Sequence, residues 1–223
     1  MHRRDFIKKV ILFSLSFVIL KTKIMANTLF KPFNLVDGVF VNNYVSHKSS
    51  FKDFWKWRRE SSKPEPITFP IVENDPEYLK SNKSENTITW IGHSTFLLQI
   101  DGINILTDPH FTKRASPLSF MGPSRTTPPG LKIEELPFID FVLISHNHYD
   151  HLDSKTIQLL LKKQNVNQPT FFVPLKLKEI ISKLGARNVM EHEWWQKTQF
   201  KNLEIHSVPV QHWSKRRFND TNK

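Results

Sequence analysis

A series of short apolar segments begins at Thr87 and continues to the end of the chain. The first three segments are either continuously apolar or alternate between apolar and polar residues. This pattern predicts strands at 87–92, 95–100 and 101–108. The third strand opens on Asp-Gly, a dipeptide that favours a hairpin turn. The continuous apolar run at 139–145 predicts a strand that is buried on both faces.

Helical and extended patterns alternate in the rest of this region. They predict helices at 154–163 and 177–185, and strands at 170–174 and 202–210. Asp153 or Ser154 is expected to cap the first of these helices, because both side chains accept hydrogen bonds from free backbone N–H groups. Strands followed by alternating strands and helices predict an α/β sandwich.

The chain before residue 87 differs in composition from the part that follows. We interpret residues 27–86 as a partly helical extension and a linker. A helix is expected at 51–60, where Trp55 and Arg58 belong to a stripe at helical spacing that we expect to pack. One domain is therefore placed at 87–223.

Residues 1–26 have the pattern of a targeting leader. The basic stretch HRRDFIKK precedes an apolar run from Val10 to Leu20, which is shorter than the roughly 20 residues that span a bilayer. The order Arg-Arg-x-Phe-Ile-Lys resembles the bacterial twin-arginine export signal. We expect an exported protein, periplasmic or membrane-associated through this segment. The alternatives are a basic amphipathic anchor and a location in the bacterial cytoplasm.

Composition removes several classes of site. The chain has no cysteine, which excludes disulfides, thiolate metal sites and a cysteine nucleophile. The net charge of +11 divides into +5 for residues 1–25 and +6 for the remainder. This excess suits ordinary solubility as well as an anionic membrane surface or a phosphate-bearing substrate. Apart from SKRRF at 214–218, no dense basic patch alternates with aromatic residues, so no nucleic-acid partner is expected.

The strongest chemical signal is the stretch LISHNHYDHLD at 143–153. It contains H-x-H-x-D-H, formed by His146, His148, Asp150 and His151. Imidazole nitrogens and a carboxylate suit zinc or another first-row divalent ion. Residues two apart point to the same side of an extended backbone, so the first two histidines can chelate one ion. Asp150 and His151 can face a second ion. The alternative interpretation is a solvated polar loop.

This motif, placed after such a strand, resembles the signature of the metallo-β-lactamase superfamily. The segments TWIGHSTFLLQIDGINILTDP, GPSRTTPPG, ISHNHYDHLD and VPVQHWSKRRFNDTNK also resemble N-acylphosphatidylethanolamine-hydrolysing phospholipase D and its bacterial relatives. The resemblance covers residues 87–223. It implies an αββα sandwich with two zinc ions, in which a metal-bound hydroxide attacks the phosphorus of an N-acyl phosphatidylethanolamine-type phospholipid. A phospholipid, or another small phosphodiester, and a membrane surface are then the expected partners.

The resemblance also implies the ligands of the two ions. His146, His148 and His212 would hold the first zinc ion. Asp150 and His151 would hold part of the second, and Asp150 would also act as the catalytic residue that orients the nucleophile.

Further residues match family positions around the site. Asp108 matches a residue that supports the metal-binding histidines, and its alternative is a turn cap before Pro109. His93 matches a position near the site, although a single histidine in a strand turn is more often structural. Trp194 and Trp213 could line the site, but we favour packing for both.

Part of the family pattern has no counterpart in this sequence. The family has a bridging aspartate and a last histidine downstream of the segment that contains His212, and residues 213–223 supply neither. We therefore expect the first half of the sandwich and a little more, with an exposed apolar inner face. The expected cause is a truncated, split or frameshifted gene, or a fragment. One bound zinc ion with weak or no turnover is expected, with a complementing C-terminal fragment or an oligomer as a further partner.

Two alternatives remain open beside the zinc-dependent phosphodiesterase. One is another hydrolase of the same fold, such as a lactonase or a nuclease. The other is a metal-binding remnant that is not an enzyme.

Overall fold

The structure is a computed structural model, and it describes residues 34–42, 50–61, 70, 72–217 and 219–223. The leader expected at 1–26 lies outside these residues. Among the helices that are described, none is long and apolar enough to cross a bilayer.

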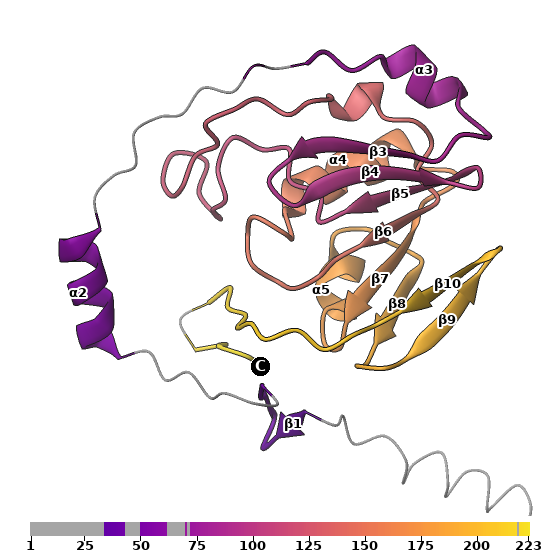
Figure 1. Ribbon diagram of the computed structural model, residues 1–223. Coiled ribbons are helices and arrows are strands. Elements are labelled where there is room, and N and C mark those ends of the chain that lie inside the picture. Colours follow the sequence, from indigo (N-terminus) through magenta and orange to yellow (C-terminus); the bar gives the residue numbers. More distant parts are fainter. Residues whose placement is uncertain (1–33, 43–49, 62–69, 71, 218) are drawn as a thin grey trace, which may run out of the picture.

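A mixed six-stranded sheet forms the centre of the described structure (Figure 1). Its strands lie in chain order: β3 (Thr87–Gly92), β4 (Thr95–Ile100), β5 (Ile103–Thr107), β6 (Phe141–Leu143), β7 (Thr170–Pro174) and β8 (Val189–His192). The first three pair antiparallel, whereas β5 to β8 pair in parallel. This architecture confirms the predicted α/β class and corresponds to the first half of the sandwich that the resemblance implies.

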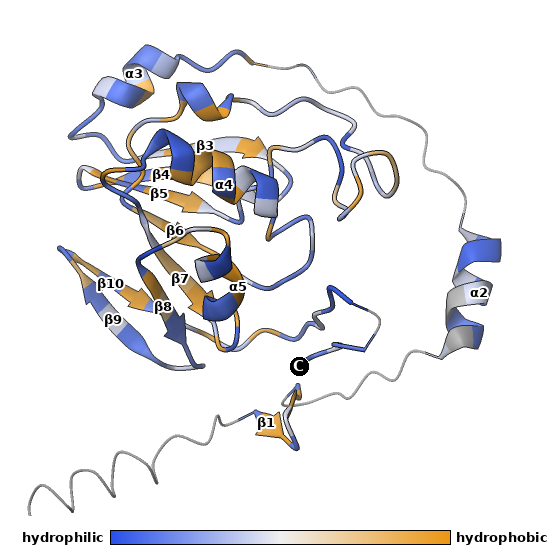
Figure 2. Ribbon diagram, turned by 180° about the vertical axis from the view of Figure 1, so that it is seen from behind, coloured by the Kyte–Doolittle hydropathy of each residue, from blue (hydrophilic) through white to orange (hydrophobic). Residues whose placement is uncertain are grey.

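Two helices cover one face of this sheet, α4 (Ser154–Lys163) and α5 (Lys178–Lys183) (Figure 2). α4 begins as predicted, because the Asp153 carboxylate accepts hydrogen bonds from two backbone N–H groups of the first turn. Ile157 and Leu160 of α4 are fully buried among apolar side chains of the sheet. Burial of such a side chain contributes about 1.5–3 kcal/mol, so α4 is held firmly on the sheet and fixes the end of the loop before it.

A hairpin covers the centre of the opposite face. It consists of β9 (Lys197–Phe200) and β10 (Leu203–His206), which pair with each other and not with the sheet. Its apolar side chains pack on a cluster from the sheet: Ile103, Ile105, Phe141 and Phe172 meet Phe200, Leu203 and Ile205. Toward β3 the face is open, since Ile88 and Trp90 are 75% and 53% exposed. The expected exposure of the whole inner face is therefore wrong at its centre, because the hairpin folds back over it.

The chain before the sheet contains a helix at the predicted place. α2 (Phe51–Glu60) begins at a capping box, in which Ser50 and Asp53 each accept a hydrogen bond from the other's backbone N–H. Trp55 and Trp57 of α2 are 52% and 61% exposed, and the packing expected for the stripe stays a prediction. Two shorter elements follow along the chain, α3 (Pro76–Ser81) and the 3₁₀ helix η1 (Ile133–Glu135).

A small N-terminal hairpin contacts the last residues of the chain. β1 (Leu35–Val36) and β2 (Val39–Phe40) form it, and the Phe40 N–H donates to the Asn222 carbonyl at 2.6 Å. Lys176, just after β7, donates to the carbonyl of Gly38 at 3.0 Å and lies over the Phe40 ring at 5.1 Å. Part of the extension expected at 27–86 thus lies against the domain.

Candidate metal centre

The residues expected to form the site gather at the edge of the sheet where the parallel strands end. The H-x-H-x-D-H loop follows β6, and Asp108 follows the neighbouring strand β5. Carboxyl ends of parallel strands are the usual position of ligand sites in open α/β sheets. In the loop, the N–H groups of His151 and Leu152 donate to the His148 carbonyl at 3.1 and 2.8 Å. The loop then places His146 and His148 in one cluster and His151 in another.

Three histidines form the first cluster. The potential ligand atoms of His146, His148 and His212 all lie within 4.8 Å of one another. His146 Nε2 lies 2.8 Å from His148 Nδ1, and the His212 ring centroid is 4.6 Å from that of His146. Nitrogens that share one tetrahedral zinc ion are roughly 3.3 Å apart, so small side-chain adjustments fit the cluster to an ion.

The electrostatics of this cluster favour neutral rings. Burial, and then the neighbouring histidines, lower the pKa of His146 to about 3. Burial, and then the charge of His212, also lower the pKa of His148. Neutral imidazole is the form that binds metal, so at neutral pH these ligands need not lose a proton first.

His93, Asp150 and His151 form a second cluster, again with potential ligand atoms within 4.8 Å of one another. His93 Nε2 lies 2.9 Å from Asp150 Oδ2, and His151 Nε2 lies 3.7 Å from the same oxygen. Burial alone would raise the pKa of Asp150, but His151, a hydrogen bond from the Asp150 backbone N–H, and then His93 and His148 together outweigh burial and lower that pKa. The carboxylate is therefore ionised at neutral pH, as a metal ligand must be.

Asp108 links the two clusters. Its carboxylate accepts hydrogen bonds from the Ser145 backbone N–H at 2.7 Å and from the Ser145 hydroxyl at 2.6 Å. The same carboxylate lies 2.8 Å from His151 Nδ1. Burial would lower the pKa of His151, but the hydrogen bond to Asp108 and the charges of Asp108 and Asp150 together outweigh burial and raise that pKa. This geometry favours support of a metal-binding histidine over a turn cap.

Arg216 is a site residue that the sequence did not reveal. Its Nη1 donates to the carbonyls of Asn147 and Leu152 at 2.9 and 2.8 Å, and its guanidinium lies 4.1 Å from the centroid of the Tyr149 ring. The Tyr149 hydroxyl in turn donates to the Arg216 carbonyl at 3.0 Å. These contacts fasten the C-terminal segment that carries His212 to the histidine loop. The only signal in the sequence was the basic stretch SKRRF, which we considered only as a possible basic patch for a nucleic acid.

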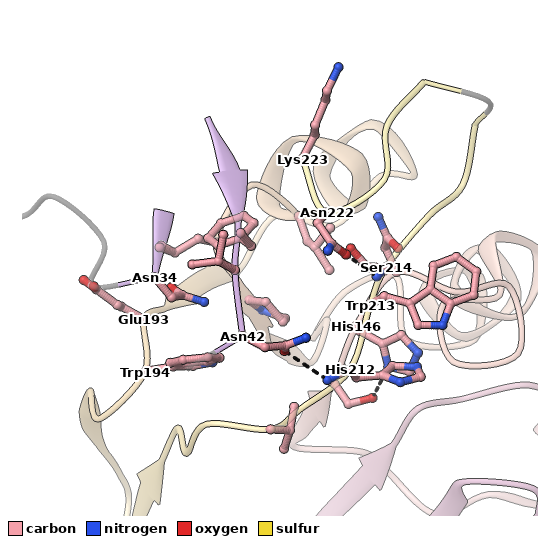
Figure 3. A pocket seen from close by; sticks show the side chains of 18 of the residues that line it. Asn34, Asn42, His146, Glu193, Trp194, His212, Trp213, Ser214, Asn222 and Lys223 are labelled. Atoms are coloured by element: carbon pink, nitrogen blue, oxygen red, sulfur yellow. Dashed lines mark hydrogen bonds between the residues drawn. The ribbon is translucent and has the colours of Figure 1, made fainter. Parts of the chain in front are cut away.

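A cavity of about 140 Å³ adjoins the first cluster. Its walls include apolar side chains from four separate segments: Phe40, Val41, Leu175, Leu177, Trp194, Val210 and Trp213. His146 and His212 also line it, and Figure 3 shows Trp194 and Trp213 on opposite sides. Asn42 accepts a hydrogen bond from the His212 N–H at 3.3 Å, so the N-terminal hairpin also helps to place that residue. Trp194 and Trp213 thus line the cavity, whereas from the sequence we favoured a packing role for both.

The structure brings all seven candidate residues of the sequence analysis into one region: His93, Asp108, His146, His148, Asp150, His151 and His212. Their roles as metal ligands remain predictions. His206 lies outside both clusters, where it forms an ion pair with Glu204.

Comparisons with known proteins agree with this site. A family model described as "Beta-lactamase superfamily domain" matches residues 103–223. The chain is 37% identical over 191 residues to an uncharacterized protein of Mycobacterium tuberculosis, covering 82% of this chain and 50% of that protein. It is 39% identical over 144 residues to N-acyl-phosphatidylethanolamine-hydrolyzing phospholipase D 1 of Caenorhabditis elegans, covering 60% and 40%.

A third relative is a UPF0173 metal-dependent hydrolase of Methanopyrus kandleri, which is 28% identical over 125 residues, covering 56% of this chain and 46% of that protein. The chain therefore spans half or less of the length of each of these three relatives.

Proposed function

The chain belongs to the beta-lactamase superfamily, and we propose that it serves the zinc-dependent hydrolysis of a phosphodiester in phospholipids of the N-acyl phosphatidylethanolamine type. The observation that carries the proposal is the convergence of His146, His148 and His212 in one cluster, next to a second cluster that contains the Asp150 carboxylate. The 39% identity to the phospholipase D of Caenorhabditis elegans supports this reaction among those of the superfamily.

Each residue of the centre has a definite task in this proposal. His146, His148 and His212 hold the zinc ion through neutral ring nitrogens, a donor set that suits zinc. An ion held by these residues would supply Lewis acidity, which would lower the pKa of water and polarise a phosphoryl oxygen. Asp150, ionised and with its side chain 37% exposed, accepts a hydrogen bond from the attacking water and orients it.

The cavity beside His146 and His212 supports an amphipathic substrate. Its walls are largely apolar, and it opens next to the histidines that would face the phosphate. A volume of about 140 Å³ accommodates only part of a lipid, so the remainder of the substrate stays at a membrane surface. The basic net charge of +11 suits the anionic face of such a membrane.

The proposal includes a location and a partner. Export through the leader at residues 1–26 would bring the protein to the periplasm or to the membrane that contains its substrate. A complementing C-terminal fragment, or a second copy of the chain, is proposed as a further partner. Cell fractionation and co-purification test these two points.

A side-by-side assay tests the reaction. The purified chain, loaded with zinc, is given N-acyl phosphatidylethanolamine vesicles, a lactone and an RNA. We expect release of phosphatidic acid and N-acylethanolamine, and loss of that release in His212→Asn but not in His206→Asn. Turnover of the lactone or RNA alone would refute the phosphodiesterase. Bound zinc without turnover on any substrate would favour the metal-binding protein that is not an enzyme.

A further inference from the structure

The N-terminal hairpin supplies one wall of the cavity beside the metal centre. Phe40 and Val41 of this segment line the cavity together with Leu175 and Leu177, which come from much later in the chain. The family model matches residues 103–223, so the hairpin lies outside the matched part. These two side chains therefore belong to the cavity without belonging to the matched domain.

A turn after β7 holds the hairpin in place. Lys176 has a φ of +70°, a left-handed conformation that is uncommon outside glycine. In this conformation its ammonium group donates to the Gly38 carbonyl at 3.0 Å and lies 5.1 Å from the centroid of the Phe40 ring. A cation within about 6 Å of an aromatic ring is attracted to its face. Because Leu175 and Leu177 flank Lys176, this one turn fixes Phe40 and also places two apolar side chains in the same cavity.

The other end of the hairpin is fixed beside the histidines. The Val41 N–H donates to the Asn34 carbonyl at 2.8 Å, and Asn34 is only 6% exposed. The next residue, Asn42, accepts the hydrogen bond from the His212 N–H that Figure 3 shows. Since the backbone is held at Val41 and at Asn42, a larger side chain at Val41 should change the cavity and not the position of the hairpin.

We propose that Phe40 and Val41 determine the length of the apolar chain that the cavity accepts, and so the lipid chains that the site prefers. The apolar chain lies against these two side chains, while the phosphate of the same molecule lies near His146 and His212, which line the same cavity. The inference deepens the proposed function and rests on it in that the occupant of the cavity is a phosphate-bearing lipid.

Binding of alkyl phosphates tests the inference without any measurement of turnover. Butyl, hexyl and octyl phosphate are titrated into the zinc-loaded full chain by isothermal calorimetry, and again with a chelator present, below the concentrations at which they form micelles. In the wild type we expect the affinity to rise about fourfold for each methylene that is buried, and to level off once the cavity is full. Because this dependence comes from the apolar walls, it should be the same with and without zinc.

Two variants should move the dependence in opposite directions. Val41→Phe should narrow the cavity and lower the affinity for octyl phosphate by about fourfold or more, with the affinity for butyl phosphate unchanged. Phe40→Leu should open room for roughly one further methylene and raise the affinity for octyl phosphate by about fourfold. Val36→Phe is the matched control, because Val36 belongs to the same hairpin, is 52% exposed and does not line the cavity. It should leave all three affinities unchanged.

The same chain-length dependence in the wild type, Val41→Phe and Phe40→Leu would overturn the inference. An equal change in Val36→Phe would do so too, because it would show that the hairpin acts through its stability and not through the side chains in the cavity. No binding of octyl phosphate to the wild type would also overturn it. Failure of the chain to hydrolyse phospholipid, with the expected binding of alkyl phosphates, would refute the proposed function and leave this inference standing.

Discussion

Replacement of Arg216 tests whether the C-terminal segment holds the metal loop in shape. The guanidinium of this residue donates to the carbonyls of Asn147 and Leu152, with a third, longer bond of 3.2 Å to the Ser154 hydroxyl. In Arg216→Met the side chain keeps an unbranched apolar stem, although a shorter one, and loses every one of these donors. The carbonyls of Asn147 and Leu152, which precede and follow residues 148–151, then lose the donor that Arg216 provides.

The magnitude follows from the number of bonds and their burial. A hydrogen bond to a charged group contributes about 1.5–3 kcal/mol when buried. Arg216 is half-buried, so water can replace part of the loss at its two short bonds. We therefore expect Arg216→Met to lower the free energy of unfolding of the metal-free chain by about 2–4 kcal/mol. With an m-value of about 2 kcal/mol/M, the urea midpoint falls by about 1–2 M.

The assay is urea unfolding with a chelator present, followed by zinc titration of each variant. Arg217→Met is the matched control, because Arg217 is exposed, and we expect it to change the unfolding free energy by less than about 0.5 kcal/mol. Arg216→Lys should give an intermediate loss, since an ammonium group cannot reproduce the planar fork of donors. Zinc affinity of Arg216→Met should fall by about tenfold or more, a cost of at least 1.4 kcal/mol for ordering the loop. Equal stability and affinity for Arg216→Met and Arg217→Met would refute this reasoning.

Three other expected outcomes concern protonation, ligand support and the cavity. The folded-state pKa of His146 is about 3, and that of His148 is also lowered. Below about pH 6.5 the unfolded chain therefore binds more protons than the folded chain. Urea midpoints of the metal-free chain should therefore fall between pH 6.5 and 3, less steeply in His146→Asn. The raised pKa of His151 stabilises the folded chain as the pH falls toward 6.5, and its contribution is constant below that pH. Asp108→Asn should lower the affinity for the zinc ion at His151 by about 10–100-fold in a competitive dye titration. An unchanged affinity would show that the Asp108 carboxylate does not support this histidine. Trp194→Ala should raise the KM for phospholipid by about tenfold with kcat and zinc content unchanged; a fall in kcat alone would contradict its place in substrate binding.

Local patterns predicted the elements nearest the site. The pattern of apolar residues identified β3, β4, β5 and α4, because burial in the structure follows it: burial alternates along β4, is nearly continuous along β5 and has helical spacing in α4. The histidine motif was visible because its four members lie within six positions of one another. Asp153 was one of the two caps considered for α4, and it is the one that caps the helix.

What the sequence did not reveal depends on contacts between distant segments. Lys197–Phe200 was missed as a strand because it is short and polar, and it pairs only with β10. The strand expected at 202–210 ends at His206, since Pro209 has no N–H to continue a ladder. The contacts of Arg216 with the histidine loop could not be expected from a basic stretch, because its acceptors lie more than 60 positions away.

The measurement that tests the central claim most directly is X-ray absorption at the zinc edge, on the chain loaded with one equivalent of zinc. The account predicts coordination by three imidazoles, with nitrogens at about 2.0–2.1 Å, and by two imidazoles in His212→Asn. A spectrum dominated by oxygen ligands, or one that is identical in the wild type and His212→Asn, would contradict it.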